Sequence, residues 1–447
     1  MNIMNSKVFT LASIAISLII FSVFMIVSGC GTVSSSSGGG STPPTIIWVS
    51  TTGSDESGNG SEANPYLTIN KALFSAGSGN IICLKEGLYQ ETTTWPATAH
   101  LTVKGESKLA TVEEDGCVNG IFRIYHAHPA DSSITFEDLT LRNGSISGNG
   151  GAIYFNLNIP LYVKNVDFIG NSAYSGAAIY LQGGSLVAEN CSFTGGSATS
   201  TNANQGGGAV YVVSGRSFYA RCCVFDDNGT RREGAQVHNR GSATLESCVL
   251  TNGSSEADGG GIFNTGTVHL KKCTIEANSA LIKGGGICNT GTFAEGRVEN
   301  CVITHNRGFD GGGMFDDSSV TINIINCTFV SNEAGCSGGG IWADDNTRMS
   351  NCIFWGNSHN QIGTSGGPFI EYSDVEGGYT DTGGGMVDVD PDFVSYPNEP
   401  LDLRLQASST LEVTRGGTGE GAPSEDFNGK PRSKADGKVS MGAYEYP

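Results

Sequence analysis

Charged residues precede four consecutive Gly-rich segments, at intervals of 25 to 27 residues: Glu233, Asp258, Lys283 and Asp310. If these segments stack as neighbouring turns of one coil, Asp258 and Asp310 could hold a calcium ion while Lys283 abstracts a proton. A metal-assisted uronate lyase could use such an arrangement. Acidic and basic side chains on neighbouring turns also form an ordinary screened ladder of ion pairs, so both interpretations stay open.

Two pairs of acids fall on adjacent repeats near the same corner, Asp316 with Asp317 and Asp344 with Asp345. Four carboxylates within a few ångströms of one another could bind calcium, because this ion prefers oxygen ligands. Paired Asp residues could also catalyse hydrolysis. Asp is favoured in tight turns for conformational reasons alone, which is the structural alternative. Calcium is the one cofactor that these patterns suggest.

A row of mostly aromatic residues follows the aliphatic residue after each Gly-rich corner: Tyr154, Tyr180, Tyr211, His238, Phe263, Cys288, Phe315 and Trp342. Strand alternation places this row opposite the aliphatic residues, which predicts that it faces solvent. Exposed rings in a row could stack on the sugar rings of a glycan. Aromatic residues on neighbouring strands also stabilise a sheet by stacking on each other. Both uses of the row remain open.

The spacing of these residues comes from a repeat that runs from Leu139 to Asn357. Its phrase is an apolar residue or Cys, any residue, a large apolar residue and usually Asn three places later, and it recurs after 27, 25, 32, 25, 25, 28, 26 and 25 residues. A fixed period of this length indicates a repeat architecture, and apolar residues two apart indicate strands with one buried face. The sequence therefore predicts an all-β, right-handed parallel β-helix, with the handedness taken from the general rule for parallel crossovers.

Thirteen Cys in an exported chain would ordinarily suggest disulfides. Seven of them instead occupy the first place of the phrase: Cys191, Cys223, Cys248, Cys273, Cys301, Cys327 and Cys352. We expect these thiols to form one inward column and to act as small buried apolar groups. The Asn of the phrase is expected to adopt a left-handed turn conformation and to hydrogen-bond the Asn of the next coil.

The first residues have the features of an export signal. Lys7 precedes an apolar run from Val8 to Val27, and small residues follow. A transmembrane anchor is the alternative. Val27-Ser-Gly-Cys30 resembles the lipobox of bacterial lipoproteins, which implies a signal peptide over residues 1–29, lipidation of Cys30 and, with Gly31 following, an outer-membrane location. The Ser/Gly/Pro-rich residues 30–44 are then a flexible tether.

The remaining chain divides into three parts by its patterns. We expect an N-terminal cap and first coils over residues 45–130, the repeats over 131–360 and a C-terminal cap over 361–447. Pro65 to Leu73 predicts a short helix that covers the open end of the coil. The opening resembles that of exported β-helix proteins, including polysaccharide-lyase-like ones, on Trp48-Val-Ser, Gly53-Ser-Asp and Gly87-Leu-Tyr. The ending, with Asp426-Phe-Asn-Gly-Lys-Pro-Arg, resembles the cap of surface-anchored β-helix proteins.

The paired signals Gly150-Gly-Ala-Ile153 and Phe168-Ile-Gly-Asn171 resemble the repeats of the polymorphic outer-membrane proteins. That family consists of surface adhesins with a β-helix passenger and a membrane barrel, and we expect no counterpart of the barrel within residues 361–447. The net charge of −19 argues against nucleic acid as a partner. We therefore expect a non-enzymatic, lipid-anchored surface protein that binds glycan or protein. The alternative is a lyase or hydrolase that acts on an acidic polysaccharide.

Overall fold

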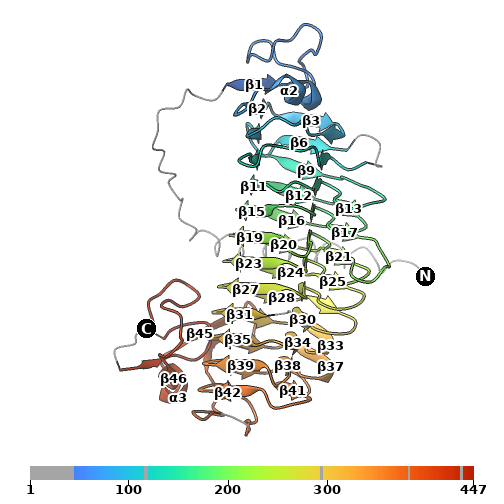
Figure 1. The fold of residues 1–447 in the computed structure, drawn as a ribbon. Helices are drawn as coiled ribbons and strands as arrows, with labels where there is room; N and C mark the ends of the chain where they lie inside the picture. The colour runs from blue at the N-terminus through green and yellow to red at the C-terminus, as the bar shows by residue number, and fades with distance from the viewer. Residues whose placement is uncertain (1–44, 115–118, 292–294, 381–382, 433–435, 447) are drawn as a thin grey trace, which may run out of the picture. The chain divides into compact units, whose positions relative to one another are not determined.

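The computed structural model describes residues 45–114, 119–291, 295–380, 383–432 and 436–446 (Figure 1). The signal peptide, Cys30 and the tether lie outside the described residues. Residues 44–447 form one compact unit. Each coil contributes short strands to three long parallel sheets and, over the middle of the chain, to a short fourth one.

Sheets A and B carry the first two strands of each coil. Sheet A consists of β1 (Ile46–Val49), β2 (Ile81–Leu84), β5 (Leu101–Gly105), β8 (Ile134–Glu137), β11 (Pro160–Lys164), β15 (Ser185–Glu189), β19 (Ser217–Arg221), β23 (Ser242–Glu246), β27 (Thr267–Lys271), β31 (Gly296–Glu299), β35 (Ile322–Ile325), β39 (Thr347–Ser350) and β42 (Phe369–Glu371). Sheet B consists of β3 (Gly87–Gln90), β6 (Ala110–Glu113), β9 (Thr140–Arg142), β12 (Asp167–Ile169), β16 (Ser192–Thr194), β20 (Val224–Asp226), β24 (Val249–Thr251), β28 (Thr274–Glu276), β32 (Val302–Thr304), β36 (Thr328–Val330), β40 (Ile353–Trp355) and β43 (Asp374–Val375).

Sheets D and C complete the coil in that order along the chain. Sheet D consists of β13 (Ser172–Ala173), β17 (Ser197–Ala198), β21 (Gly229–Thr230), β25 (Ser254–Ser255), β29 (Ser279–Ala280), β33 (Arg307–Asp310) and β37 (Glu333–Ser337). Sheet C consists of β4 (Thr93–Thr94), β7 (Phe122–Ile124), β10 (Ile153–Phe155), β14 (Ile179–Leu181), β18 (Val210–Val212), β22 (Val237–Asn239), β26 (Ile262–Asn264), β30 (Ile287–Gly291), β34 (Met314–Ser318), β38 (Ile341–Ala343) and β41 (Ile362–Thr364). The predicted parallel β-helix is confirmed.

Equivalent residues of successive coils lie over one another, as the repeat predicts. All seven Cys of the phrase are at most 2% exposed, and the structure has them as free thiols. The large apolar residue of the phrase forms a second inward column, in which the rings of Phe168, Phe193 and Phe225 stack at centroid distances of 4.7 Å. Burial raises the pKa of the Cys248 and Cys301 thiols well above the ordinary value, so these groups stay neutral.

The Asn of the phrase forms the predicted ladder, with one correction. Asn278 Nδ2 donates to Asn306 Oδ1 at 3.0 Å, and Asn306 Nδ2 donates to Asn332 Oδ1 at 3.0 Å. The left-handed conformation, however, belongs to the preceding residue, such as Ala277 (φ 53°) or His305 (φ 55°). A residue there turns the chain so that the Asn side chain points inward, where its amide also donates to a backbone carbonyl of the preceding coil.

A helix and an irregular segment cover the two ends of the core. Helix α2 (Ile69–Ser75) buries Ile69, Ala72 and Leu73 in the main core cluster. It begins later than expected from Pro65, because Thr68 caps it with a hydrogen bond from the Lys71 N–H. At the other end, Tyr379 and Met386 pack against the same core cluster.

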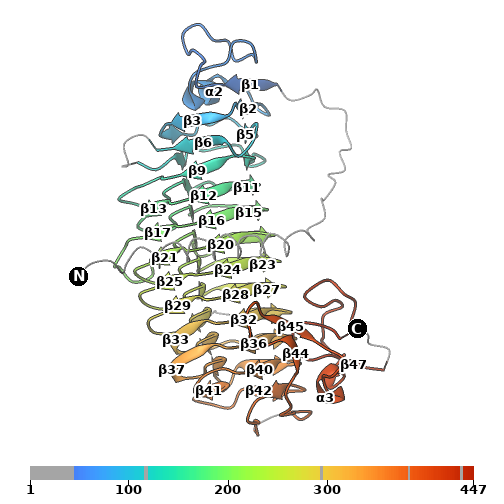
Figure 2. The same ribbon diagram turned by 180° about the vertical axis from the view of Figure 1, so that it is seen from behind.

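The C-terminal residues pack against the side of the last coils (Figures 1 and 2). They contain β44 (Phe393–Ser395), β45 (Asp402–Leu405), α3 (Leu411–Thr414), β46 (Gly417–Thr418) and β47 (Lys438–Val439). The outward residues Val302, Val330 and Ile353 of sheet B form an apolar strip under these residues. The partners of this strip in the C-terminal part are Phe393, Leu403, Leu405, Val413, Met441 and Ala443. The strip is thereby removed from water.

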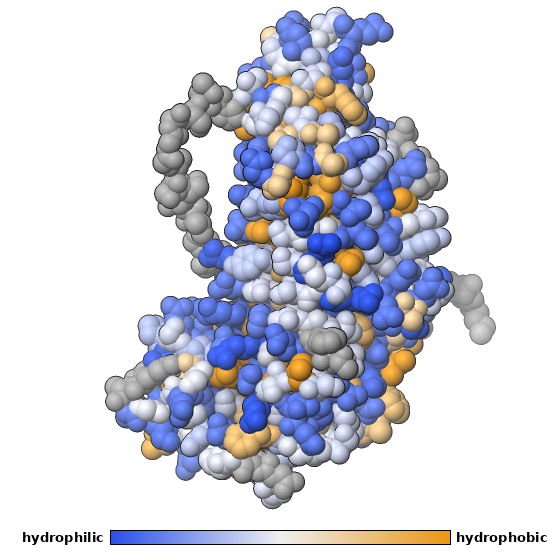
Figure 3. Space-filling view, viewed as in Figure 1, coloured by the Kyte–Doolittle hydropathy of each residue, from blue (hydrophilic) through white to orange (hydrophobic). Residues whose placement is uncertain are grey.

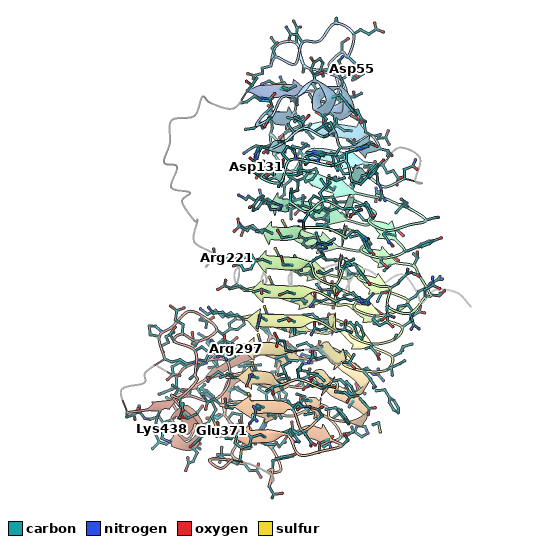
Figure 4. All side chains as sticks on the ribbon, viewed as in Figure 1. Asp55, Asp131, Arg221, Arg297, Glu371 and Lys438 are labelled. Carbon is teal, nitrogen blue, oxygen red and sulfur yellow. The ribbon has the colours of Figure 1, made fainter. Side chains whose placement is uncertain are left out.

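A row of alternating charges runs along the outer face of sheet A. On eight successive strands the register aligns Lys104, Glu137, Lys164, Glu189, Arg221, Glu246, Lys271 and Glu299. Lys104 Nζ lies 3.2 Å from Glu137 Oε1, and Lys271 Nζ lies 3.6 Å from Glu246 Oε1. Arg221, labelled in Figure 4, belongs to this row. In this arrangement each charge lies beside an opposite charge on the neighbouring strand. A strand that paired one coil further along would lie beside a like charge, so the alternation favours the observed pairing.

Candidate functional site

The aromatic row lies on the outer face of sheet C, where its members stack along the coil axis. Ring centroids are 5.8 Å apart for Tyr154 and Tyr180, 5.0 Å for Tyr180 and Tyr211, and 4.5 Å for Phe315 and Trp342. Plain stacking, one of the two uses expected for this row, therefore occurs. The register of β10, β14 and β18 keeps the first three rings in line.

The expectation that the whole row faces solvent was wrong. Its middle is buried: the exposed fractions are 3% for Tyr211, 0% for His238, 6% for Phe263, 0% for Cys288 and 2% for Phe315. The corner segments between sheets D and C fold over this face. The Tyr211 hydroxyl donates to the Asn204 carbonyl at 2.7 Å, and His238 Nδ1 lies 3.2 Å from the Glu233 carbonyl oxygen. Only Tyr154, Tyr180 and Trp342 are half-exposed.

Tyr154 and Tyr180 form the more extended accessible part of the row. Their planes differ by 3°. The Arg123 guanidinium lies 4.4 Å from the Tyr154 ring centroid and donates to the backbone carbonyls of Asn149 and Gly150 at 2.8 and 3.1 Å. This arginine therefore fixes the end of the stack and is itself held by the backbone of the next coil.

Glu233, Asp258, Lys283 and Asp310 lie in successive corner segments beside the aromatic row, as their spacing predicts. Backbone bridging joins Lys283 with Asp310, and the Lys283 N–H donates to Asp258 Oδ1 at 3.0 Å. The Lys283 ammonium lies 4.3 Å from the centroid of the Phe315 ring. Glu233 pairs with its neighbour Arg232 at 3.1 Å. The charged groups thus contact the backbone, an adjacent residue and a ring.

Two acids of this row, Glu233 and Asp258, hold protons more readily than free acids do. Burial is the largest cause that raises the pKa of Asp258, while the Lys283 N–H and the Lys283 charge lower it. Burial also raises the pKa of Glu233, against the lowering effect of Arg232. A buried acid with a raised pKa is a candidate proton donor. Both acids have this property.

Asp316 ends a second amide ladder that the sequence analysis missed. Asn239, Asn264 and Asn289 are buried on successive strands of sheet C, and each donates to the next residue, at 2.6, 2.6 and 2.8 Å; the last acceptor is Asp316 Oδ1. The Thr347 hydroxyl donates to Asp316 Oδ2 at 2.5 Å. Burial raises the pKa of Asp316 to about 6, against the lowering effect of these hydrogen bonds. Recurrence of Asn two places after the aliphatic residue was the signal for this ladder.

Of the four carboxylates that suggested calcium, the structure brings Asp316 and Asp344 to the same hydroxyl: Thr347 Oγ1 lies 2.5 Å from Asp316 Oδ2 and 3.4 Å from Asp344 Oδ1. Asp316 is buried whereas Asp317, next on the strand, is exposed. Asp344 accepts the Asn346 N–H at 2.9 Å within its own turn, and Asp345 accepts the Gly367 N–H. In the described ranges, no three His, Cys, Asp or Glu side chains are placed to hold a metal ion.

Membrane attachment was predicted for parts of the chain that the structure does not describe. Within the described part, no helix is long and apolar enough to cross a bilayer. Figure 3 shows a face on which hydrophilic side chains predominate, in keeping with the excess of acidic residues.

Two family models match the chain. Residues 208–377 match the model described as "Right handed beta helix region", and residues 51–240 match that described as "Protein of unknown function (DUF1565)". The chain is a right-handed parallel β-helix protein. This result confirms the predicted handedness. No curated protein matches the chain.

Several solved structures resemble this β-helix protein. A pectate lyase, Pel9A, shares 15% identity with a TM-score of 0.48, over 91% of this chain and 97% of its own. The catalytic unit of a GH87 alpha-1,3-glucanase from Streptomyces thermodiastaticus strain HF3-3 shares 12% identity with a TM-score of 0.46, over 80% and 71%. The pectin methylesterase PemA from Erwinia chrysanthemi shares 15% identity with a TM-score of 0.29, over 77% and 93%. At these identities and TM-scores the likeness transfers no activity to this chain.

Proposed function

We propose that this protein is a non-enzymatic, surface-anchored β-helix that binds glycan through the accessible end of its aromatic row. The observation that supports this proposal is the parallel, half-exposed pair Tyr154 and Tyr180 on the outer face of sheet C. Aromatic faces offer large apolar area at little conformational cost, and the apolar faces of sugar rings can stack on them. Lipid on Cys30 and the tether of residues 31–44 would hold this face away from the membrane.

The contacts of the charged row favour binding over catalysis. A proton-abstracting lysine needs a free, neutral amine near the substrate. The Lys283 ammonium instead lies on the Phe315 ring, an environment that stabilises its charge. Asp258, its expected neighbour in a metal site, accepts the Lys283 backbone N–H. We therefore infer that the row belongs to the corner packing.

Binding can be tested with a glycan array and the lipid-free mature chain. Tyr154→Ala and Tyr180→Ala, singly and together, should abolish the signal. Tyr162→Ala is the matched control, because Tyr162 is a half-buried tyrosine on the outer face of sheet A. Equal loss in the control, or an unchanged signal in the double variant, would contradict the proposal.

A second function, action on an acidic polysaccharide, is favoured by the raised pKa values of Glu233 and Asp258 beside the aromatic row. Incubation with pectin, alginate and glycosaminoglycan in calcium-containing buffer would reveal a lyase through the ultraviolet absorbance of unsaturated products. Reducing-sugar release would reveal a hydrolase. Activity that disappears in Lys283→Ala or Asp258→Asn, with the fold intact, would establish the enzyme in place of the binding protein.

A further inference from the structure

Asp374 is a buried carboxyl at the junction between the last coil and the C-terminal residues. It belongs to β43, where Val375 points into the main core and Asp374 points outward beside Ile353 of β40. The side chain is nevertheless 0% exposed. Its position on the outer face shows that the cover comes from the chain that follows the coils.

One oxygen of this carboxyl is hydrogen-bonded and the other is not. Oδ1 accepts the Val389 N–H at 3.2 Å, and Val387 bridges to Asp374 through the backbone. Oδ2 is fully buried and has no partner among the described residues. A buried carboxylate oxygen without a donor costs free energy, because it has left water and gained nothing. A proton on Oδ2 removes the charge and most of that cost.

The charges that act on Asp374 are acidic. They come from Glu376 in its own turn and from Asp388 and Asp390 in the covering segment, whereas β40 presents the uncharged Ile353. Burial is the largest cause that raises the pKa of Asp374 to about 7; the Val389 N–H lowers it, and the three acids raise it. Geometry and charge therefore favour the neutral carboxyl.

We propose that Asp374 is a proton-operated latch for the C-terminal residues. With the carboxyl neutral, the segment of residues 387–392 packs over β43 and holds the C-terminal part against the apolar strip Val302, Val330 and Ile353. With the carboxyl ionised, the segment loosens and the strip becomes accessible. The latch is independent of glycan binding, because it lies at the last coil and the Tyr154–Tyr180 pair lies in sheet C of earlier coils.

The direction of the pH effect follows from the two states of the latch. An exposed Asp has a pKa of about 3.9. The closed state, with its higher pKa, is most favoured below that value and loses its advantage as pH rises toward 7. The opening constant should rise by nearly tenfold per pH unit in this window, roughly 50-fold from pH 5 to pH 7, and level off above it.

Amide hydrogen exchange of the full mature chain, corrected for intrinsic rates, measures opening at Val387 and Val389. We expect the 50-fold rise between pH 5 and pH 7 in the native protein. Asp374→Asn should give slow exchange that does not depend on pH. The matched control is Asp316→Asn, because Asp316 is another buried carboxyl with a raised pKa but lies in sheet C; it should keep the native profile.

A flat profile in the native protein, or a native slope in Asp374→Asn, would overturn the latch. If Asp374→Asn does not fold, the exposed acids provide the test. The double variant Asp388→Asn with Asp390→Asn should reduce opening at pH 7. An unchanged exchange profile in this variant would also overturn the latch. Closure of the native segment by millimolar calcium at pH 8, lost in Asp374→Asn, would show a cation site in place of a proton latch.

Discussion

The ammonium of Lys283 lies 4.3 Å from the centroid of the Phe315 ring, one coil further along the β-helix. Because Phe315 is buried in the middle of the aromatic row, the lysine closes the row from outside. A residue whose spacing suggested a catalytic base is thus part of the cover of sheet C.

Removal of this cation should therefore affect stability. Lys283→Met should lower the free energy of unfolding by about 0.5–2 kcal/mol, since a cation over a partly desolvated ring contributes that much. Lys283→Arg should retain most of this stabilisation, because it keeps a cation over the ring. Denaturant unfolding measures the difference, and glycan binding by Tyr154 and Tyr180 should be unchanged. Equal free energies of unfolding for the Lys283→Met variant and the native chain would contradict this role.

Removal of one amide from the Asn ladder should lower the free energy of unfolding more than Lys283→Met does. Asn306→Ala leaves the buried backbone N–H of Asn278 without its acceptor, removes one of the two acceptors of Asn278 Nδ2, and removes one of the donors to Asn332 Oδ1. The loss should be about 1–3 kcal/mol for each orphaned group. Asn252→Gly is the control, because Asn252 is exposed, bonds to Asp226 on the surface and has a φ of 54° that glycine adopts without strain. Thermal unfolding should separate the two variants clearly.

His238 predicts loss of stability in acid. Burial lowers its pKa to about 3, so the folded chain holds it neutral while the unfolded chain protonates it near pH 6.5. The stability that it contributes is complete above pH 6.5 and falls by about 1.4 kcal/mol per pH unit down to about pH 3. His238→Phe keeps a ring between Tyr211 and Phe263 and should flatten this part of the curve. An unchanged slope in urea unfolding would refute the assignment.

Thiol labelling checks the interior column of cysteines. Cys336 is exposed, whereas the Cys of the phrase are buried and free. A native chain should therefore label rapidly at Cys336, and the column thiols should react only on unfolding. Mass spectrometry of the labelled peptides identifies the sites. Rapid native labelling of Cys273 would contradict the stacked interior, and Cys336→Ser is the control that should remove the rapid phase.

The charge row of sheet A predicts a coupled pair of changes. Glu246→Lys places three cations in sequence with Arg221 and Lys271 and should cost about 1 kcal/mol at low salt, with a smaller effect at high salt. The further change Lys271→Glu should recover part of the loss, because the introduced lysine then has a carboxylate on one of its two neighbouring strands. A double-mutant cycle measures the coupling. Additive effects would show that the row does not contribute to register.

The repeat predicted the parts of the fold that depend on coil-to-coil stacking. A period near 25 residues forces Cys248 above Cys273 and Asn278 above Asn306, and no further information is needed to place them. The same period also aligns Asp316 with Asn239, Asn264 and Asn289, and aligns the charged residues from Lys104 to Glu299. Those rows recur with the same period, so the sequence alone would have been enough to predict them.

The sequence pattern could not predict what covers a given face. The alternation of apolar residues predicts on which side of its strand Tyr211 lies. The burial of Tyr211, however, depends on the path of the corner segment that carries Asn204. The C-terminal part has no period, and its contacts join residues far apart in sequence, as in the hydrogen bond from Asn326 Nδ2 to the Ser440 carbonyl at 2.9 Å. Such contacts leave no local signal.

The position of the C-terminal residues has a consequence for biosynthesis. Coils can stack one after another as the polypeptide emerges, since each needs only the coil before it. The strip of Val302, Val330 and Ile353 must wait for Met441 and Ala443, which are made after all the coils. A nascent or truncated chain that lacks these residues would expose an apolar flank to neighbouring molecules, and the synthesis of the covering residues removes that risk of association.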